Sequence, residues 1–267
     1  MKLAIAGKGG VGKTTLAALL AQAYADAGRD VLVVDADPAP CLAQALGFPA
    51  ELRAGLQPIA AMADLIAERT GARPGTYGGF FTLNPRVDDL PEQFSIRHRG
   101  VRLLEMGGVE KGGSGCICPE SALLKTLFTH LLFRQDEVLI LDMYAGVEHL
   151  GRATADFVDA MLIVSEPTRR SLGTAAQIAR LAQDIGLTRL WLVGNKVRDE
   201  GEAAFLQAES PGLPLLGWLP AAAGVQEADR LGVPAYDHVP ALREAAFKLI
   251  ERLETEVSAR AASAMPG

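Results

Sequence analysis

A glycine-rich stretch near the N-terminus constrains the fold more than any other part of the sequence. Residues 7–15 read G-K-G-G-V-G-K-T-T, after an apolar run at 3–6 and before an apolar helical pattern that reaches Tyr24. A buried strand, a glycine turn and a helix N-terminus in this order form a loop whose backbone N–H groups and helix dipole attract phosphate. A simple glycine turn is the alternative, but the strand before and the helix after favour a nucleotide site.

The positions of this loop have distinct predicted roles. Lys13 places a positive charge on the β- and γ-phosphates, and the Thr14 hydroxyl is positioned to ligate Mg²⁺. The residues expected to bind the nucleotide are Gly9, Gly10, Val11, Gly12, Lys13, Thr14 and Thr15.

Lys8 is a second cation in the same loop. A second lysine at this position would lie too close to the phosphates bound by its own subunit, and Lys13 already contacts those phosphates. Its physical use is in trans, as a positive finger that reaches the nucleotide of a partner subunit. An ordinary exposed loop lysine is the alternative. The trans interpretation predicts a dimer.

Two later strands end in aspartates. The apolar run 31–34 is followed by Asp35-Ala36-Asp37-Pro38, and the run 138–141 by Asp142. Carboxylates at the C-terminal ends of parallel strands beside a phosphate loop face the nucleotide, although Asp and Pro also end strands in ordinary turns. Asp142 has the Walker B form, so it is expected to bind Mg²⁺ directly or through water.

The chain length and charge limit the class of protein. The 267 residues are 49% hydrophobic and carry a net charge of −6, which suits one large α/β domain over 1–267. The acidic balance argues against non-specific nucleic-acid binding and against an anionic membrane surface. The first strand begins at once, without a signal peptide pattern, and three cysteines suggest no disulfide framework, so we expect a cytoplasmic protein.

Strands and helices alternate along the rest of the chain, which predicts a mostly parallel sheet with helices on both faces. Residues 41–72 show a helical pattern, with Leu52 among the expected core residues and Cys41 expected to be a small buried hydrophobe. Residues 73–100 form an irregular insertion rich in proline and glycine. An amphipathic helix over about 240–261 is expected to pack on the core, because its polar face is acidic and unsuited to a membrane surface.

Cys116 and Cys118 depart most clearly from a simple nucleotide-binding chain. Residues i and i+2 of an extended segment point the same way, so two thiolates can hold one Zn²⁺, Ni²⁺ or Cu⁺ ion. Two ligands do not complete a tetrahedral site, but a two-fold partner supplies two more. A redox pair or a merely buried pair is the alternative.

The loop spelling K-G-G-V-G-K-T-T at 8–15 resembles the deviant P-loop ATPases, which include MinD, ParA, the nitrogenase iron protein and the arsenite-pump ATPase. The resemblance implies an ATP-dependent dimer with Lys8 crossing the interface. It also implies that Asp37 orients the attacking water, that Asp35 lies near the Mg²⁺ shell and that Asp142 is the switch II aspartate. The family's base-recognition positions match Asn195, whose amide would bond adenine, and the backbone around Pro220.

A narrower resemblance rests on four segments: Asp35-Ala36-Asp37-Pro38, F-F-T-L-N-P-R-V-D-D at 80–89, G-C-I-C-P-E at 115–120 and D-M-Y-A-G-V-E-H-L-G at 142–151. Together with the loop they are similar to the CooC family of ATPases, which assist nickel insertion into carbon monoxide dehydrogenase. This resemblance implies a homodimer that depends on ATP and metal, with Ni²⁺ or Zn²⁺ on the C-x-C pair and carbon monoxide dehydrogenase as the client enzyme.

Two other functions fit parts of the sequence. An iron-protein-like reductase would share a [4Fe–4S] cluster across a dimer, but the position that resembles its second cysteine is Ala145. Four cysteines from two chains could still hold a cluster. A MinD/ParA-type positioning ATPase would need a basic face or tail, and it assigns no role to Cys116 and Cys118.

Overall fold

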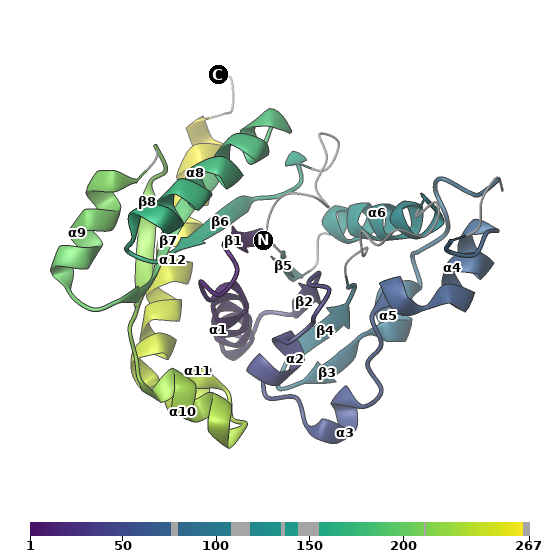
Figure 1. Cartoon of the computed structure of the whole chain (residues 1–267), viewed down its shortest axis with the longest axis horizontal. Helices are drawn as coiled ribbons and strands as arrows, with labels where there is room; N and C mark the ends of the chain where they lie inside the picture. Colours follow the sequence, from purple (N-terminus) through teal and green to yellow (C-terminus); the bar gives the residue numbers. More distant parts are fainter. Residues whose placement is uncertain (76–79, 108–117, 135–136, 144–154, 211, 264–267) are drawn as a thin grey trace.

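The computed structural model describes residues 1–75, 80–107, 118–134, 137–143, 155–210 and 212–263, with the backbone alone for Cys118 and 261–263. An eight-stranded sheet forms the centre of the described chain, in the order β3-β4-β2-β5-β1-β6-β7-β8 (Figure 1). All neighbours are parallel except β3 and β4. The strands are β1 (Lys2–Gly7), β2 (Val31–Asp35), β3 (Ile96–His98), β4 (Val101–Glu105), β5 (Val138–Asp142), β6 (Ala160–Ser165), β7 (Leu190–Val197) and β8 (Leu215–Pro220). The prediction of a mostly parallel sheet is therefore confirmed.

Helices cover both faces of the sheet, as predicted. Buried side chains of α4, α6, α8 and α9 pack on one face, and those of α1, α2, α11 and α12 pack on the other. The helices are α1 (Lys13–Asp26), α2 (Leu42–Ala45), α3 (Ala50–Arg53), η1 (Ile59–Ala61), α4 (Ala63–Thr70), α5 (Leu90–Phe94), α6 (Cys118–Phe133), α8 (Arg169–Asp184), α9 (Glu200–Glu209), α10 (Gly224–Leu231), α11 (Ala235–His238) and α12 (Pro240–Ser263).

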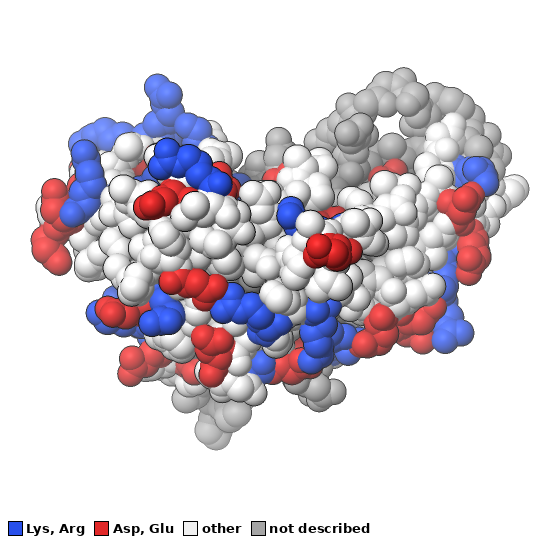
Figure 2. All heavy atoms as spheres, turned by 90° about the horizontal axis from the view of Figure 1, so that it is seen from below, with Lys and Arg blue, Asp and Glu red and all other residues white. Residues whose placement is uncertain are grey.

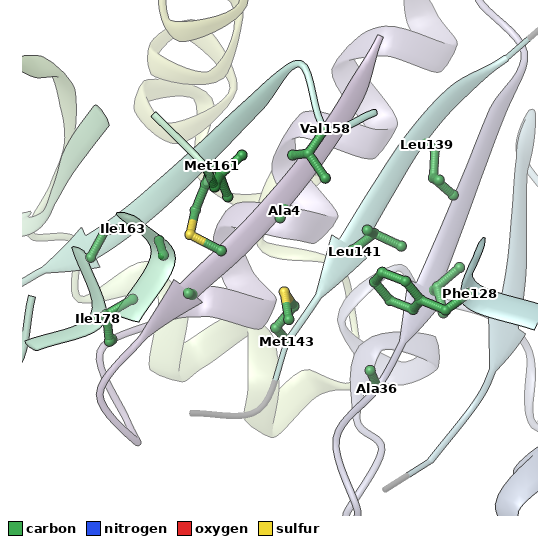
Figure 3. Packing of buried hydrophobic residues seen from close by; sticks show 14 of the residues in the cluster. Ala4, Ala36, Phe128, Leu139, Leu141, Met143, Val158, Met161, Ile163 and Ile178 are labelled. Carbon is green, nitrogen blue, oxygen red and sulfur yellow. The ribbon is translucent and has the colours of Figure 1, made fainter. Parts of the chain in front are cut away.

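The strands divide their side chains between two cores. In β2, Leu32 and Val34 join the core under α6 and α8, while Val31 and Val33 join the core under α1 and α12. The alternation follows from the two-residue period of a strand, and the wholly apolar sequence follows from burial on both faces. Figure 3 shows the first core, where Phe128 of α6 lies among side chains of the central strands.

Helix α1 lies at the centre of the other layer. Its residues from Leu16 to Tyr24 are all buried, which explains why the segment has no polar face. It contacts the sheet and α12 together. This packing fixes the N-terminus of α1 at the C-terminal edge of β1, where the glycine loop arrives. The central helix therefore positions the predicted phosphate site.

The helical pattern predicted over residues 41–72 is wrong as a continuous element. The segment forms α2, α3, η1 and α4, because Pro49 and Pro58 interrupt the hydrogen-bond ladder. Two of its expected core residues are also wrong. Leu52 is 37% exposed, and Cys41 is an exposed free cysteine.

The insertion over 73–100 is less irregular than its composition suggests. It contains the short helix α5, with Pro91 near its start, and the edge strand β3. The predicted C-terminal helix corresponds to α12, and Leu242, Ala246 and Leu253 bury its apolar stripe.

Charges of both signs are interspersed over the molecular face in Figure 2. Along the segments that the structure describes, no helix is both long and apolar enough to cross a membrane.

Candidate nucleotide site

The loop between β1 and α1 has the backbone geometry of an anion cradle. Gly10 and Gly12 have left-handed φ angles of 77° and 95°, which favour glycine. Gly12 caps α1 without a side-chain hydrogen bond to the first turn. In the described part of the chain, the N–H groups of Gly9, Gly10 and Gly12 donate to no protein group. These unpaired donors at a helix N-terminus suit phosphate oxygens.

The two loop lysines differ in environment. Lys13 is 8% exposed, and its Nζ lies 3.4 Å from the carbonyl oxygen of Lys8. The Lys8 side chain is exposed and makes no hydrogen bond or ion pair with any described residue. Lys13 is therefore held at the cradle, whereas Lys8 presents an unpaired charge to its surroundings.

Asp142 and Thr14 meet at the end of β5. The Thr14 hydroxyl donates to Asp142 Oδ2 at 2.6 Å, and the buried Asp142 Oδ1 has no hydrogen-bond partner among the described residues. Burial raises the pKa of Asp142 to about 7, although the Thr14 hydrogen bond opposes the shift. A hydroxyl beside an unpaired carboxylate oxygen is a hard-oxygen donor set, so these residues fit Mg²⁺.

Both carboxylate oxygens of Asp35 accept backbone N–H groups of the loop after β2. Its Oδ1 accepts the N–H of Asp37 at 3.0 Å, and its Oδ2 accepts the N–H groups of Cys41 and Leu42, both at 3.0 Å. Burial raises its pKa, while these backbone bonds oppose the shift. The fully buried carboxylate holds the loop after β2 in place. Its predicted part in the Mg²⁺ shell stays a prediction, and the half-buried Asp37 is the aspartate at the surface of this loop.

Sequence reasoning missed Glu105, which completes a row of three buried carboxylates. Parallel pairing places Asp35 level with Asp142 on one side and with Glu105 on the other. Burial raises the pKa of Glu105, and the negative charge of Asp35 raises it further. The strand end 101–106 was visible in the sequence, but the register that brings Glu105 beside Asp35 was not.

Asn195 and Pro220 lie at the ends of β7 and β8. The Asn195 amide nitrogen donates to the Val11 carbonyl at 2.6 Å, so the residue lies against the glycine loop. The predicted bond from Asn195 to adenine stays a prediction. Pro220 is partly buried and lines a hollow between β8 and α12.

A cavity of about 330 Å³ adjoins the cradle between α1, α2 and α10. Thr14, Thr15 and Cys41 line it on the loop side, and Gln226 and Asp229 line it on the α10 side. No motif in the sequence of α10 predicts this position beside the loop. The cradle therefore continues into a half-open, mainly apolar space of the kind that accepts small molecules.

The predicted metal pair lies outside the description. Cys116 belongs to the undescribed segment 108–117, and only the backbone of Cys118 is described, as the first residue of α6. Among the residues whose side chains are described, no group of three or more His, Cys, Asp or Glu could hold a metal ion.

Replacing Asp142 by Asn tests the electrostatics of the cradle. A raised pKa means that the folded state favours the neutral carboxyl, so wild-type stability falls relative to Asp142→Asn as pH rises from about 4 to about 7. Between pH 5 and pH 8 the difference in unfolding free energy should grow by about 2–3 kcal/mol in favour of Asn. Urea unfolding without nucleotide at both pH values measures it, and a pH-independent difference would contradict the raised pKa.

Comparison with known proteins agrees with this geometry. Residues 2–235 match the CobQ/CobB/MinD/ParA nucleotide binding domain. The chain is 47% identical over 253 residues to the carbon monoxide dehydrogenase accessory protein CooC of Rhodospirillum rubrum, covering 95% of this chain and 96% of that protein. It is also 47% identical over 236 residues to an uncharacterised ATP-binding protein of Methanocaldococcus jannaschii, covering 88% and 90%.

Solved structures support the fold. The MinD cell division protein of Aquifex aeolicus superposes with a TM-score of 0.67 over 96% of this chain and 97% of that chain, at 18% sequence identity. At this identity the likeness establishes the arrangement of strands and helices alone.

Proposed function

The chain belongs to the CobQ/CobB/MinD/ParA nucleotide-binding family and is a P-loop ATPase of the CooC type, and from this premise we propose that it delivers nickel to carbon monoxide dehydrogenase. The observation that carries the proposal is the 47% identity to CooC over nearly the whole chain, in a sequence that also contains Cys116-x-Cys118. The proposed cargo is Ni²⁺, with Zn²⁺ as the competing ion for thiolates.

The residues of the cradle have separate tasks in ATP hydrolysis. The free N–H groups of Gly9, Gly10 and Gly12 are available to the phosphates, and Lys13 adds a charge from its buried position. Thr14 and Asp142 would hold Mg²⁺, which neutralises phosphate charge when bound. Asp37 would orient the attacking water from the surface of the loop after β2.

We propose that the catalytically complete form of the ATPase is a homodimer. Lys8 has no partner within the described chain and is exposed, as a residue that reaches a second subunit requires. In a two-fold dimer the same loop would receive Lys8 from the other subunit. The same symmetry would bring four thiolates together from two copies of Cys116 and Cys118, giving a four-sulfur site for a soft or borderline metal.

Nucleotide and metal are then linked. ATP binding favours the closed dimer, and closure changes the geometry around the four thiolates, so metal affinity depends on nucleotide state. By reciprocity, the metal changes nucleotide affinity to the same extent. Base contacts from the backbone around Pro220, and a reducing cytoplasm that keeps the thiols free, complete the proposal.

Nickel transfer tests the function directly. The full chain with Ni²⁺ and Mg²⁺-ATP should load nickel-free carbon monoxide dehydrogenase faster than free Ni²⁺ at the same concentration. Replacing ATP by ADP should remove the advantage, because the proposed transfer depends on nucleotide state. Equal loading by free Ni²⁺ would contradict delivery. A stoichiometric content of iron and sulfide after anaerobic purification would favour an iron-protein-like reductase instead.

A further inference from the structure

Two consecutive residues at the end of β7 hold two consecutive carbonyl groups of the phosphate loop. Asn195 Nδ2 donates to the Val11 carbonyl at 2.6 Å, and Lys196 Nζ donates to the Gly10 carbonyl at 3.1 Å. We propose that Asn195 and Lys196, the β7 clamp, are positioning residues that fix the conformation of the phosphate loop and orient its Gly12 N–H. The inference rests on nucleotide binding by this ATPase and is independent of nickel delivery.

The orientation of the Asn195 amide is fixed by its neighbours. Its Oδ1 accepts the backbone N–H of Lys196 at 2.8 Å, and a backbone N–H only donates. The nitrogen must therefore face the Val11 carbonyl, which only accepts. The side chain is 6% exposed, so this arrangement is protected from water. Rotating the amide by a half turn would place like groups together at both contacts.

Close packing joins the clamp to the loop. A Cβ atom built on Gly12 would lie 2.1 Å from Asn195 Nδ2, so only glycine allows the amide to reach its acceptor. Gly12 also has the left-handed φ of 95°. The requirement for glycine at this position thus has two causes, the backbone conformation and the contact with Asn195.

The clamp acts through peptide planarity. In a trans peptide group, C=O and the following N–H point in opposite directions. Holding the Val11 carbonyl against Asn195 therefore directs the Gly12 N–H to the opposite side, and that N–H donates to no described protein group. Holding the Gly10 carbonyl fixes the preceding peptide group, whose Val11 N–H donates to the Lys8 carbonyl at 3.3 Å and closes the turn of the loop. These bonds organise the cradle before any anion arrives, which lowers the ordering cost of binding.

Lys196 is held in an unusual conformation for this task. Its φ is 57°, and Lys196 and Arg99 are the non-glycine residues with positive φ in the described chain. A positive φ is strained in a lysine, so this backbone conformation persists only where contacts with surrounding residues compensate for its cost. Here Lys196 Nζ also pairs with Glu166 Oε1 at 2.5 Å, just beyond the end of β6. The clamp is thereby anchored to two strands.

If the clamp is broken, we expect binding of the phosphate groups to weaken and the preference for the base to stay the same. Asn195→Asp keeps the shape but replaces the donor by an oxygen facing the Val11 carbonyl. Lys196→Met keeps the apolar part of the side chain and removes the Nζ donor. Both should raise the Kd of ATP, GTP and inorganic tripolyphosphate by a similar factor of about ten, since each change removes a hydrogen bond that orders the phosphate loop. The ratio of ATP to GTP affinity should not change.

The full-length variants are compared by calorimetry with Arg198→Met as the matched control. Arg198 lies two residues beyond Lys196, is exposed and bonds to Glu202 rather than to the loop, so this variant should bind all three ligands normally. An unchanged tripolyphosphate Kd together with an altered ATP-to-GTP ratio would overturn the inference and make Asn195 a reader of the base. Unchanged Kd values for all ligands, with only a lower melting temperature, would also overturn it and leave a structural contact.

If Asn195→Asp does not fold, Lys196→Met decides the question alone, because its side chain is exposed and its loss leaves no buried cavity. The proposed nickel delivery is tested on other residues, so a failed clamp leaves that proposal intact.

Discussion

Lys8→Ala should reduce ATP hydrolysis by about 10³-fold or more, the range expected when a cation supplied in trans is removed from a phosphoryl-transfer site. Nucleotide binding to the isolated chain should survive, because Lys13 and the free N–H groups of the cradle remain in place. Steady-state phosphate release and equilibrium ATP binding measure the two effects separately. Lys125→Ala, a change at an exposed lysine on α6, is the control.

Mixing two inactive variants distinguishes a trans from a cis role. In a dimer of Lys8→Ala with Asp37→Ala, the first subunit keeps Asp37 and would receive Lys8 from the second, so one of the two sites is complete. A trans finger therefore predicts that mixing restores hydrolysis to roughly half of the wild-type rate in the mixed dimer. If Lys8 acts in its own subunit, both sites stay defective and mixing restores nothing. A normal rate for Lys8→Ala alone would exclude either role.

Replacing Cys116 and Cys118 by Ser should abolish tight binding of Ni²⁺ and Zn²⁺ while leaving ATP affinity unchanged. Thiolates are the ligands that hold these metals in a four-sulfur site, and a hydroxyl is a far weaker ligand for them. The change should also remove the part of dimer formation that depends on metal. Metal analysis after dialysis and equilibrium ATP binding provide the two measurements.

The matched control for this pair is Cys41→Ser. Cys41 is the third cysteine, it is exposed, and its sulfur lies 3.8 Å from the Thr14 hydroxyl in the candidate nucleotide site. Its replacement should leave the metal content unchanged. Equal metal binding by the Cys116 and Cys118 variant and by wild type would contradict the assignment of the metal to these thiols.

The strongest local patterns predicted the fold. Apolar runs of four residues, followed by Gly7, Asp35 and Asp142, correspond to β1, β2 and β5. Such runs are informative because strands buried on both faces need apolar side chains at every position. The glycine loop was equally predictable, since its spacing follows from the backbone geometry that phosphate binding requires.

Short elements were harder to predict. Residues 41–72 have enough apolar positions to imitate a long helix, but Pro49 separates α2 from α3, and Pro58 separates α3 from η1 and α4. The prolines outweigh the periodicity, because a proline disfavours helical backbone at the residue before it. Helix α5 and strand β3 are too short for any period to be visible, so packing against neighbours determines them.

The partners of the site residues depended on tertiary structure. Asp35 and Asp142 have the same position in the sequence pattern, at the end of an apolar strand. Yet Asp35 accepts three backbone N–H groups, whereas one oxygen of Asp142 has no partner in the described chain. Likewise, the contact of Asn195 with Val11 joins residues 184 positions apart. Strand register and loop packing decide such contacts, and a single sequence does not specify them locally.

The central claim is that nucleotide state controls a metal held between two subunits. Native mass spectrometry of the wild-type chain, with bound metal quantified at matched Ni²⁺ in the presence of ATP or ADP, tests it most directly. The account predicts a dimer that carries one metal ion for every two chains, with a metal affinity that differs between the two nucleotides. One metal ion per monomer, or the same metal affinity with ATP and with ADP, would contradict it.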